Sequence, residues 1–352
     1  MRRLLHLSVA LCLAGCGQQV SNVGPSATAH PNPSATASSI PSVPSVMAEQ
    51  EAVLGPGGMT LRQEIGAVMM VGFKGSLTPA ILADWRQHQF GGLIVVPINQ
   101  NGQDPAAIRQ LIQSVRGVMA HPVLSATNQE GGTVCFQETR VPCMAGARQV
   151  GVQGPAAVQS EMTSMSQGLK GLGFDINFAP VADVWDGVHP FMSERSYGQN
   201  PQAVAQDVSA AIAGIHAAGI YAAAKHLESA EMLRTRDWIP FQAASAAHVE
   251  FVMIGPPDVS STVIAMLRTE LGYPGVIISD DLQMGALTPE FPKAAVRFLA
   301  NGGDMVIVSH DIAVADATYD AVHAAVLSGT YPRTQLDASV QKLLSLGLRY
   351  MP

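Results

Sequence analysis

The chain has 352 residues, of which 47% are hydrophobic and 13% are charged, and its formal net charge is −7 at pH 7. This length is enough for one large α/β domain and an unstructured extension. The negative charge, without a cluster of Lys or Arg beyond the N-terminus, excludes nucleic acid as the expected partner, because phosphates would find nothing to bind. The sequence also predicts no metal and no organic cofactor, because no set of His, Cys and Asp has ligand spacing.

The first residues have the pattern of a lipoprotein signal peptide, which we assign to residues 1–16. Two arginines precede an apolar stretch from Leu4 to Leu13, and Leu13-Ala14-Gly15-Cys16 places small residues before a cysteine, as in a lipobox. Cys16 is therefore the expected site of lipidation. The alternative is an apolar N-terminus with a chance cysteine.

The expected anchor is a set of acyl chains on Cys16, because the apolar stretch is too short to span a membrane. The protein is then exported and attached to the bacterial cell envelope. Gly17 in place of Asp after the cysteine favours the outer membrane where the source has one, and otherwise the outer face of the cell membrane.

Residues 17–55 form a predicted disordered tether. They are rich in Ser, Pro, Ala and Thr, and they contain few large apolar side chains. Burial cannot offset the entropy of ordering such a segment. Residues 56–352 make up the folded domain, which the tether holds at some distance from the membrane.

Short apolar runs alternate with helical patterns along the folded domain. The runs are continuously apolar, which is typical of parallel strands covered on both faces. About eight alternations predict a single (β/α)₈ barrel of the TIM type. The predicted strands are Gly66 to Phe73, Gly91 to Pro97, Pro122 to Thr127, Phe174 to Pro180, Gly219 to His226, Phe251 to Gly255, Gly275 to Asp280 and Asp304 to His310. Predicted helices include Pro105 to Met119, Ala156 to Leu172, Pro201 to Ala218, Ser260 to Leu271 and Leu336 to Leu348.

Two further cysteines, Cys135 and Cys143, lie close together after the third predicted strand. Export to an oxidising compartment favours a disulfide between them. The alternative is that they are two small buried residues near a loop.

Polar side chains follow most of the predicted strands, at the end of a barrel where active sites form. Taken singly, each has a structural explanation: Asp183 and Asp281 could cap helices, Glu194 could pair with Arg195, and Lys225 could be a solvated strand end. Together on one rim they favour a polar pocket. The segments concerned are Asn128 to Gly132, Asp183, Glu194 to Gly198, Lys225-His226, Asp280-Asp281 and Ser309-His310.

These segments, in this order, resemble the catalytic domain of glycoside hydrolase family 3, and within it the β-N-acetylhexosaminidases. The resemblance covers roughly Thr60 to Tyr350, and together its motifs are highly specific for the fold. They are Gly91-Gly92-Leu93-Ile94, Gln129-Glu130-Gly131-Gly132, the run from Gly173 to Val184, Glu194-Arg195-Ser196-Tyr197-Gly198, Lys225-His226 and the run from Gly275 to Met284.

The resemblance implies a retaining hydrolysis of a carbohydrate. The first carboxylate of the Ser-Asp-Asp-Leu motif, Asp280, would attack the anomeric carbon and form a glycosyl-enzyme. The family's residues at Arg195, Lys225 and His226 hold sugar hydroxyls, and its acid at Asp183 helps to line the pocket. Donors of this kind orient the sugar.

The loop after the fifth strand departs from the family pattern. The hexosaminidases follow Lys-His with Phe-Pro-Gly-His-Gly and then with Asp-Ser-His, whose Asp-His dyad is the acid/base. Here the loop is about two residues shorter, and the dyad position falls on Arg234-Thr235-Arg236. Arginine stays protonated, so it cannot transfer a proton to a glycosidic oxygen.

Further positions of the expected pocket are also changed. Asn128 replaces the Asp that binds a sugar hydroxyl before Gln-Glu-Gly-Gly, although Asn128 and Glu130 still occupy substrate-binding positions. Thr133 replaces an Arg, and Pro256 stands where a His would follow Gly255.

Glu228 and Glu231 are the candidates for a replacement acid/base, because both lie in the shortened loop and glutamate is the usual acid in other glycosidases. The alternative is that both are solvated loop residues, paired with Arg234 or Arg236.

Three functions are compatible with these observations. The first is a lipid-anchored glycoside hydrolase that acts on β-linked N-acetylglucosamine or a related β-glycoside of cell-wall fragments. The second is a catalytically impaired relative that binds glycan or an envelope partner. The third, a structural envelope lipoprotein without a sugar pocket, is disfavoured by the preserved nucleophile strand.

Overall fold

The structure, a computed structural model, describes residues 51–136, 139–227, 229–255, 261–281 and 290–346. The predicted signal peptide, Cys16 and residues 17–50 lie outside these ranges, as do Glu228 and Pro256. At the end of the predicted tether, Glu51 Oε1 lies 2.8 Å from His323 Nε2. Within the described ranges, no helix has both the length and the apolar character needed to cross a membrane.

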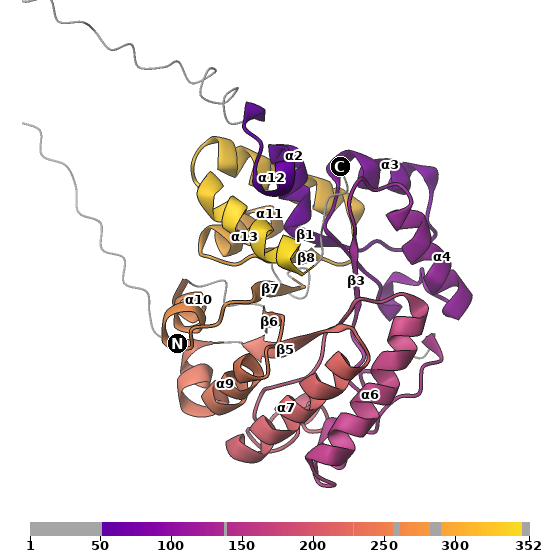
Figure 1. Ribbon diagram of the computed structural model, residues 1–352, viewed down its shortest axis with the longest axis vertical. Coiled ribbons are helices and arrows are strands. Elements are labelled where there is room, and N and C mark those ends of the chain that lie inside the picture. The colour runs from indigo at the N-terminus through magenta and orange to yellow at the C-terminus, as the bar shows by residue number, and fades with distance from the viewer. Residues whose placement is uncertain (1–50, 137–138, 228, 256–260, 282–289, 347–352) are drawn as a thin grey trace, which may run out of the picture. The chain divides into compact units, whose positions relative to one another are not determined.

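Eight parallel strands close into a barrel in chain order, which confirms the predicted (β/α)₈ architecture (Figure 1). The ring closes because β1 pairs with both β2 and β8. The strands are β1 (Met69–Val71), β2 (Gly92–Ile94), β3 (Leu124–Thr127), β4 (Ile176–Asn177), β5 (Tyr221–Leu227), β6 (Phe251–Ile254), β7 (Val276–Asp281) and β8 (Met305–Val308).

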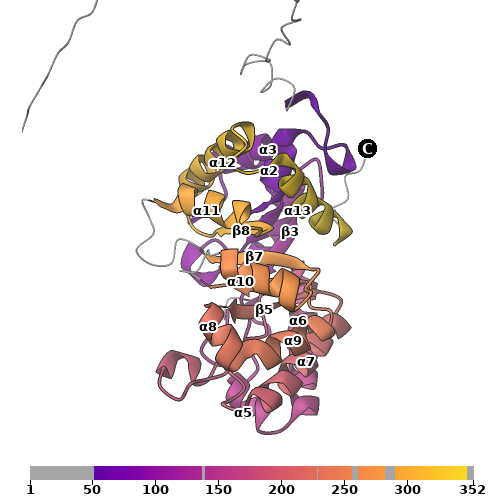
Figure 2. The same cartoon turned by 90° about the vertical axis from the view of Figure 1, so that its left-hand side faces the viewer.

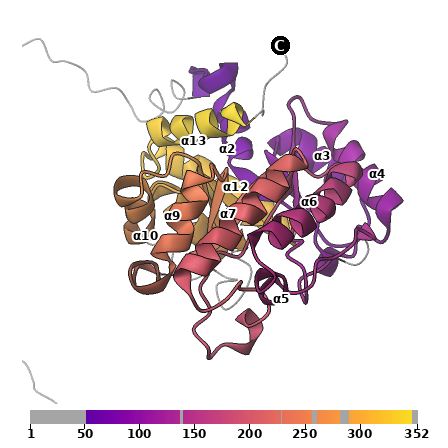
Figure 3. The same cartoon turned by 60° about the horizontal axis from the view of Figure 1, so that its bottom comes forward.

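Helices surround the barrel, and α6 and α7 pack side by side on its flank (Figure 3). On another side, α11 and α12 lie together beside β8 (Figure 2). The α-helices are α2 (Leu61–Ala67), α3 (Pro79–His88), α4 (Pro105–Arg116), α5 (Ala147–Gly151), α6 (Pro155–Leu172), α7 (Pro201–Ala217), α8 (Ala230–Met232), α9 (Trp238–Ala246), α10 (Ser261–Ala265), α11 (Phe291–Ala300), α12 (Ile312–Leu327) and α13 (Arg333–Ser345). The 3₁₀ segments are Pro56–Gly58, Pro97–Asn99 and Pro190–Met192, and the π-helical segments are Leu233–Asp237 and Met266–Glu270.

Local sequence explains where the helices begin. Asp104 accepts hydrogen bonds from the backbone N–H groups of Ala106 and Ala107, and Pro105 occupies the first turn of α4. Asn200 and Pro201 start α7 in the same way. The side-chain acceptor binds the N–H groups of the first turn, which have no partner within the helix. The proline that follows has a φ that already suits a helix.

Several predicted bounds differ from the structure, and three of the differences are as follows. The predicted strand from Gly66 begins within α2, because Thr60 and Gln63 form a capping box that starts a helix ending at Ala67. The strand predicted from Phe174 to Pro180 is reduced to the two residues of β4. The single helix predicted from Ser260 to Leu271 is instead α10 followed by a π-helical segment.

The apolar runs form the barrel core. Every residue of β6 and of β8 is buried, which is the pattern of strands covered by helices on one side and by the barrel interior on the other. The strands therefore form the centre of the hydrophobic core, and the polar groups lie at the two ends of the barrel.

Asp304 fixes the last helix to the barrel at the start of β8. It is 1% exposed and accepts hydrogen bonds from Ile277 N at 2.8 Å and Ser339 Oγ at 3.0 Å. It also pairs with Lys342 Nζ at 2.6 Å and with Arg268. One carboxylate thus joins β7, β8, α13 and the π-helical segment after α10.

We predict that Asp304→Ala destabilises the protein by about 3–5 kcal/mol, because removing one partner of a buried ion pair leaves the opposite charges without compensation. The free energy of unfolding from urea titration checks this value. Lys293→Ala is the matched control, since Lys293 and Glu290 are 71% and 54% exposed. That substitution should cost no more than about 0.5 kcal/mol, and equal losses in the two variants would contradict the assignment.

Candidate active site

A buried ion cluster occupies the end of the barrel at which the strands finish, and Glu130 lies at its centre. Arg195 donates to both oxygens of Glu130, at 2.7 and 2.8 Å, and Lys225 Nζ lies 2.6 Å from Glu130 Oε1. Burial alone would raise the pKa of Glu130, but the charges of Lys225 and Arg195 outweigh it and lower the pKa to about 2. The carboxylate is therefore ionised throughout the neutral range.

The turn after β3 holds Glu130 in place. Gly131 has φ +99°, and a Cβ on it would lie 2.9 Å from the carbonyl oxygens of Met144 and Ala145. Gln129 is fixed on the other side, because its backbone N–H donates to Asn177 Oδ1 and its carbonyl accepts from Asn177 Nδ2. Gly131 is thus needed in the Gln-Glu-Gly-Gly turn, because any side chain would clash with the backbone of Met144 and Ala145.

A disulfide joins Cys135 to Cys143 beside this turn, with their Cα atoms 6.2 Å apart. Gln129 Nε2 donates to Cys135 Sγ at 3.3 Å, and Gln129 Oε1 accepts from Phe136 N at 2.8 Å. The bridge and the amide together tie the loop after β3 to the residue that precedes Glu130.

A bulge at the end of β5 brings two adjacent side chains into the cluster. The register of β5 with β6 shifts between Ala224 and Leu227. Neighbouring side chains of a regular strand point to opposite faces, whereas a bulge can redirect them. Lys225 reaches Glu130 and also donates to Asn128 Oδ1 at 3.0 Å, while His226 reaches Arg195 and Asp183.

The hydrogen bonds of His226 define its protonation. Arg195 Nη2 lies 3.1 Å from His226 Nε2, and because a guanidinium can only donate, Nε2 must accept. The proton is therefore on Nδ1, which donates to Asp183 Oδ2 at 2.9 Å. Asp183 also accepts from the His226 backbone N–H. Both ring nitrogens of His226 are thus engaged, Nε2 with Arg195 and Nδ1 with Asp183.

Asp280 and Asp281 separate at the end of β7, where the register with β8 shifts between Ile278 and Asp281. Asp281 turns toward β8 and contacts Ser309 Oγ and His310 Nε2. Asp280 Oδ1 accepts from Asp281 N at 2.6 Å, and the Asp280 side chain is half-buried.

Asp280 lies within electrostatic reach of the cluster. Burial opposes a charged Arg195, but its bonds to Glu130 and the charges of Asp183 and Asp280 raise the pKa of Arg195. Burial lowers the pKa of Lys225, and the charges of Glu130 and Asp280 oppose that shift. The charge of Asp280 therefore acts on the same two cations that bind Glu130.

Six residues predicted to bind substrate thus form one network of direct contacts. These are Asn128, Glu130, Asp183, Arg195, Lys225 and His226. Two simpler interpretations are replaced by the structure: Arg195 pairs with Glu130 and not with Glu194, and Asp183 and Asp281 bind histidines of the rim.

The altered loop after β5 is held by arginines. Arg234 pairs with Glu270 at 2.9 Å, and Arg236 lies 3.7 Å from Asp186 Oδ2 and 3.4 Å from Asp237 Oδ1. The structure therefore gives both arginines partners other than Glu231, which is exposed on α8. Glu228 lies outside the described residues.

Asp237 is a buried carboxyl behind this loop. Its Oδ1 accepts from Val184 N at 2.9 Å. Burial and the neighbouring charge of Asp183 raise the pKa of Asp237 to about 7, although the Val184 N–H and Arg236 oppose the shift. No sequence pattern points to this group, because only folding brings residues 183 and 237 together.

The loop after β4 contributes four further residues that the sequence did not single out. Asp186 pairs with His189, whose Nδ1 lies 2.5 Å from Asp186 Oδ2. Phe191 and Met192 follow and contact the Arg195 guanidinium. The Asp-x-x-His spacing was the available signal for the pair.

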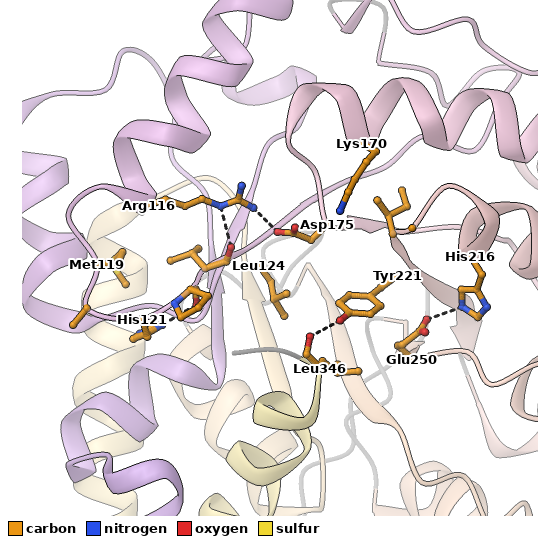
Figure 4. Close-up of a pocket in the computed structure, with 15 residues that line it drawn as sticks. Arg116, Met119, His121, Leu124, Lys170, Asp175, His216, Tyr221, Glu250 and Leu346 are labelled. Carbon is orange, nitrogen blue, oxygen red and sulfur yellow. Dashed lines mark hydrogen bonds and ion pairs between the residues drawn. The ribbon is translucent and has the colours of Figure 1, made fainter. Parts of the chain in front are cut away.

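A cavity of about 680 Å³ lies at the opposite end of the barrel, among residues that precede β3, β4, β5 and β6 (Figure 4). Four of its lining residues form two pairs: Arg116 with Asp175, and His216 with Glu250 at 3.0 Å. Asp280 is not among its lining residues. This cavity is therefore separate from the rim that carries the ion cluster.

Solved structures of glycoside hydrolases share this architecture. A family 3 β-N-acetylglucosaminidase from a Paenibacillus species superposes with a TM-score of 0.75 at 28% identity, over 83% of this chain and 63% of that chain. A family 3 glycosyl hydrolase from Mycobacterium smegmatis superposes with a TM-score of 0.74 at 22% identity, over 84% of this chain and 98% of that chain, and supports the fold alone.

Sequence relatives agree with the structural ones. A β-hexosaminidase from Stenotrophomonas maltophilia is 27% identical over 290 residues, which are 72% of this chain and 86% of that protein. One from Alkalilimnicola ehrlichii is 30% identical over 256 residues, 62% of this chain and 73% of that protein. Residues 60–346 match the model of the glycosyl hydrolase family 3 N terminal domain. The chain therefore belongs to glycosyl hydrolase family 3 and is a glycoside hydrolase of β-N-acetylhexosaminidase type.

Proposed function

We propose that this protein is a lipid-anchored, retaining glycosidase that removes β-linked N-acetylglucosamine, or a closely related β-glycoside, from cell-wall fragments. The observation that carries the proposal is the position of Asp280 at the end of β7, where its charge acts on Arg195 and Lys225. The names of the relatives, which are β-hexosaminidases and a β-N-acetylglucosaminidase, support the substrate class.

Asp280 is the nucleophile in this proposal. One of its oxygens attacks the anomeric carbon as the bond to the leaving oxygen breaks, and a glycosyl-enzyme ester forms. Water then attacks the same carbon and releases the Asp280 carboxylate. Asp280 suits this role because its described hydrogen bond, from Asp281 N, uses Oδ1, and because its side chain is half-buried at the rim.

The ion cluster supplies the polar groups that would orient the sugar. Lys225 and Arg195 are charged donors, and Asn128 and Asp183 are held with them. Because these groups are fixed by one another before substrate arrives, little reorganisation is needed when charge develops at the anomeric carbon.

A second function, glycan binding without turnover, is supported by the loop after β5. There Arg236 is tied to Asp186 and Asp237 at the position where the family resemblance places a catalytic histidine. The same ion cluster could hold a sugar without hydrolysing it.

We predict that the purified protein hydrolyses an activated aryl N-acetylglucosaminide and that Asp280→Ala lowers kcat by about 10³-fold or more, because the nucleophile is lost. Release of the aryl alcohol measures the rate. Asp320→Ala, at an exposed carboxylate on α12, is the control and should keep the full rate. A folded protein without any turnover would favour the glycan-binding function.

We also predict that Cys16→Ala transfers the protein from the membrane fraction to the soluble fraction of an expressing bacterium. Without the thiol, no acyl chain can be attached, and the tether cannot hold the barrel at the membrane. Fractionation and labelling with a fatty-acid analogue check this result. Cys12→Ala is the matched control and should leave the protein attached; equal membrane association in both variants would argue against the lipid anchor.

A further inference from the structure

The loop between β4 and α7 holds an Asp–His pair in a defined geometry. His189 Nδ1 lies 2.5 Å from Asp186 Oδ2, while Asp186 Oδ1 accepts from the backbone N–H groups of Val188 at 2.8 Å and His189 at 3.1 Å. These bonds hold the pKa of the Asp186 carboxyl well below its usual value. The carboxylate thus stays ionised and fixes the imidazole with its other nitrogen, Nε2, directed away from Asp186.

The loop that carries this pair contacts the ion cluster through Arg195. Two residues beyond His189, the Phe191 ring lies 4.6 Å from the Arg195 guanidinium, and Arg195 Nη1 donates to Met192 Sδ at 3.4 Å. Before the pair, Trp185 Nε1 donates to the His189 carbonyl at 3.0 Å. The loop is therefore held on both sides of His189. Trp185 holds it on the N-terminal side, and Arg195, which also binds Glu130, holds it on the C-terminal side.

The altered loop after β5 also contacts the pair. Arg236 Nη1 lies 3.7 Å from Asp186 Oδ2, and the same guanidinium reaches Asp237. An arginine cannot transfer a proton, but it can hold the carboxylate of a neighbouring loop. The two loops thus meet at Asp186.

Comparison with the other histidines of the described rim distinguishes His189. The side chains of His226 and His310 are 11% and 19% exposed, and both ring nitrogens of each are engaged by Asp183 and Arg195 or by Asp281 and Asn99. The His189 side chain is 72% exposed, and its described side-chain contact is through Nδ1. Of these three, His189 is the imidazole that can exchange a proton with a bound molecule.

We propose that His189 is the acid/base of the hydrolysis and that Asp186 is its positioning residue. This inference rests on the proposed function, with Asp280 as nucleophile. It assigns the proton transfers to the loop after β4, and not to Glu228 or Glu231 in the loop after β5.

In the first step, protonated His189 donates its Nε2 proton to the glycosidic oxygen. The C1–O bond breaks with its electron pair going to that oxygen, and an Asp280 oxygen bonds to C1. In the second step, neutral Nε2 takes a proton from water, the water oxygen bonds to C1, and the ester bond to Asp280 breaks. Imidazole suits both steps because it titrates near neutral pH.

The test compares substrates whose leaving groups need different amounts of protonation. In the full chain, His189→Gln should lower kcat/KM by about 10²- to 10⁴-fold for an alkyl or sugar leaving group, which needs a proton. For a dinitrophenyl leaving group the loss should be under about 10-fold. Azide should then restore deglycosylation and yield the β-glycosyl azide, because this anion attacks C1 without a base.

Three control variants separate this role from others. His216→Gln changes a histidine that is also paired with a carboxylate, Glu250, but at the opposite end of the barrel, and it should leave both substrates unaffected. Glu228→Gln and Glu231→Gln should likewise show no dependence on the leaving group. A thermal melt of each variant shows that it is folded.

Asp186→Asn tests the positioning role. Without the carboxylate, the imidazolium form of His189 loses its negatively charged partner, so we expect the alkaline limb of the kcat profile to move to lower pH. Among the described residues, the charged groups that face the pair are Arg236, Asp237 through the Arg236 guanidinium, and Arg148 through Trp185. Burial raises the pKa of Asp237 to about 7, so the shift should also be present when Asp186→Asn is made in an Asp237→Asn background. A purely structural role for Asp186 would leave the profile in place.

The outcomes distinguish the two proposals. Turnover that depends on Asp280, with the same leaving-group dependence in His189→Gln as in the parent protein, overturns the assignment of His189 and leaves the hydrolase standing. A leaving-group effect in Glu228→Gln or Glu231→Gln alone overturns it as well. If neither substrate is hydrolysed by the folded parent protein, the proposed function fails, and the role of His189 fails with it.

Discussion

The buried carboxylate of Glu130, held between Lys225 and Arg195, is the interaction on which the rest of the site depends. A lone charge at this depth would be very costly, and so would either cation without it. Each member is therefore fixed by the others, and each comes from a different part of the chain: the turn after β3, the loop after β4 and the tip of β5. Closure of the barrel brings these three parts together, so the fold and the site stabilise each other.

Two irregularities in the strands, at the ends of β5 and β7, direct the side chains of the site toward one rim. The register shifts at the ends of β5 and β7 allow adjacent side chains to serve one rim in different ways. Lys225 binds Glu130 while His226 binds Asp183, and Asp281 binds His310 while the charge of Asp280 acts on Lys225 and Arg195. A regular strand would direct one member of each pair away from the rim. The site therefore uses positions where the ladder of hydrogen bonds is interrupted.

Much of this arrangement was predictable from the sequence, and the physical reason is simple. Continuous apolar strands predict a closed parallel barrel, and the polar residues after them must then share one rim, so the sequence alone is enough to place Glu130, Lys225 and Asp280 together. The pairing of Asp186 with His189, and the contact of Arg236 with Asp186, could not be predicted in this way. The first depends on the conformation of one irregular loop, and the second on how two such loops fold against each other; neither is set by periodicity. The same holds for Asp237, whose raised pKa results from burial next to Asp183.

The central claim is that the Asp280 carboxylate forms a covalent bond to the sugar. Its most direct test is mass spectrometry of proteolytic peptides after reaction with a fluorinated N-acetylglucosaminyl fluoride, which forms the glycosyl-enzyme quickly and releases it slowly. The account predicts a sugar adduct on the peptide that contains Asp280, located on that side chain by fragmentation. An adduct on another carboxylate, or hydrolysis by a folded protein in which Asp280 never becomes labelled, would contradict it.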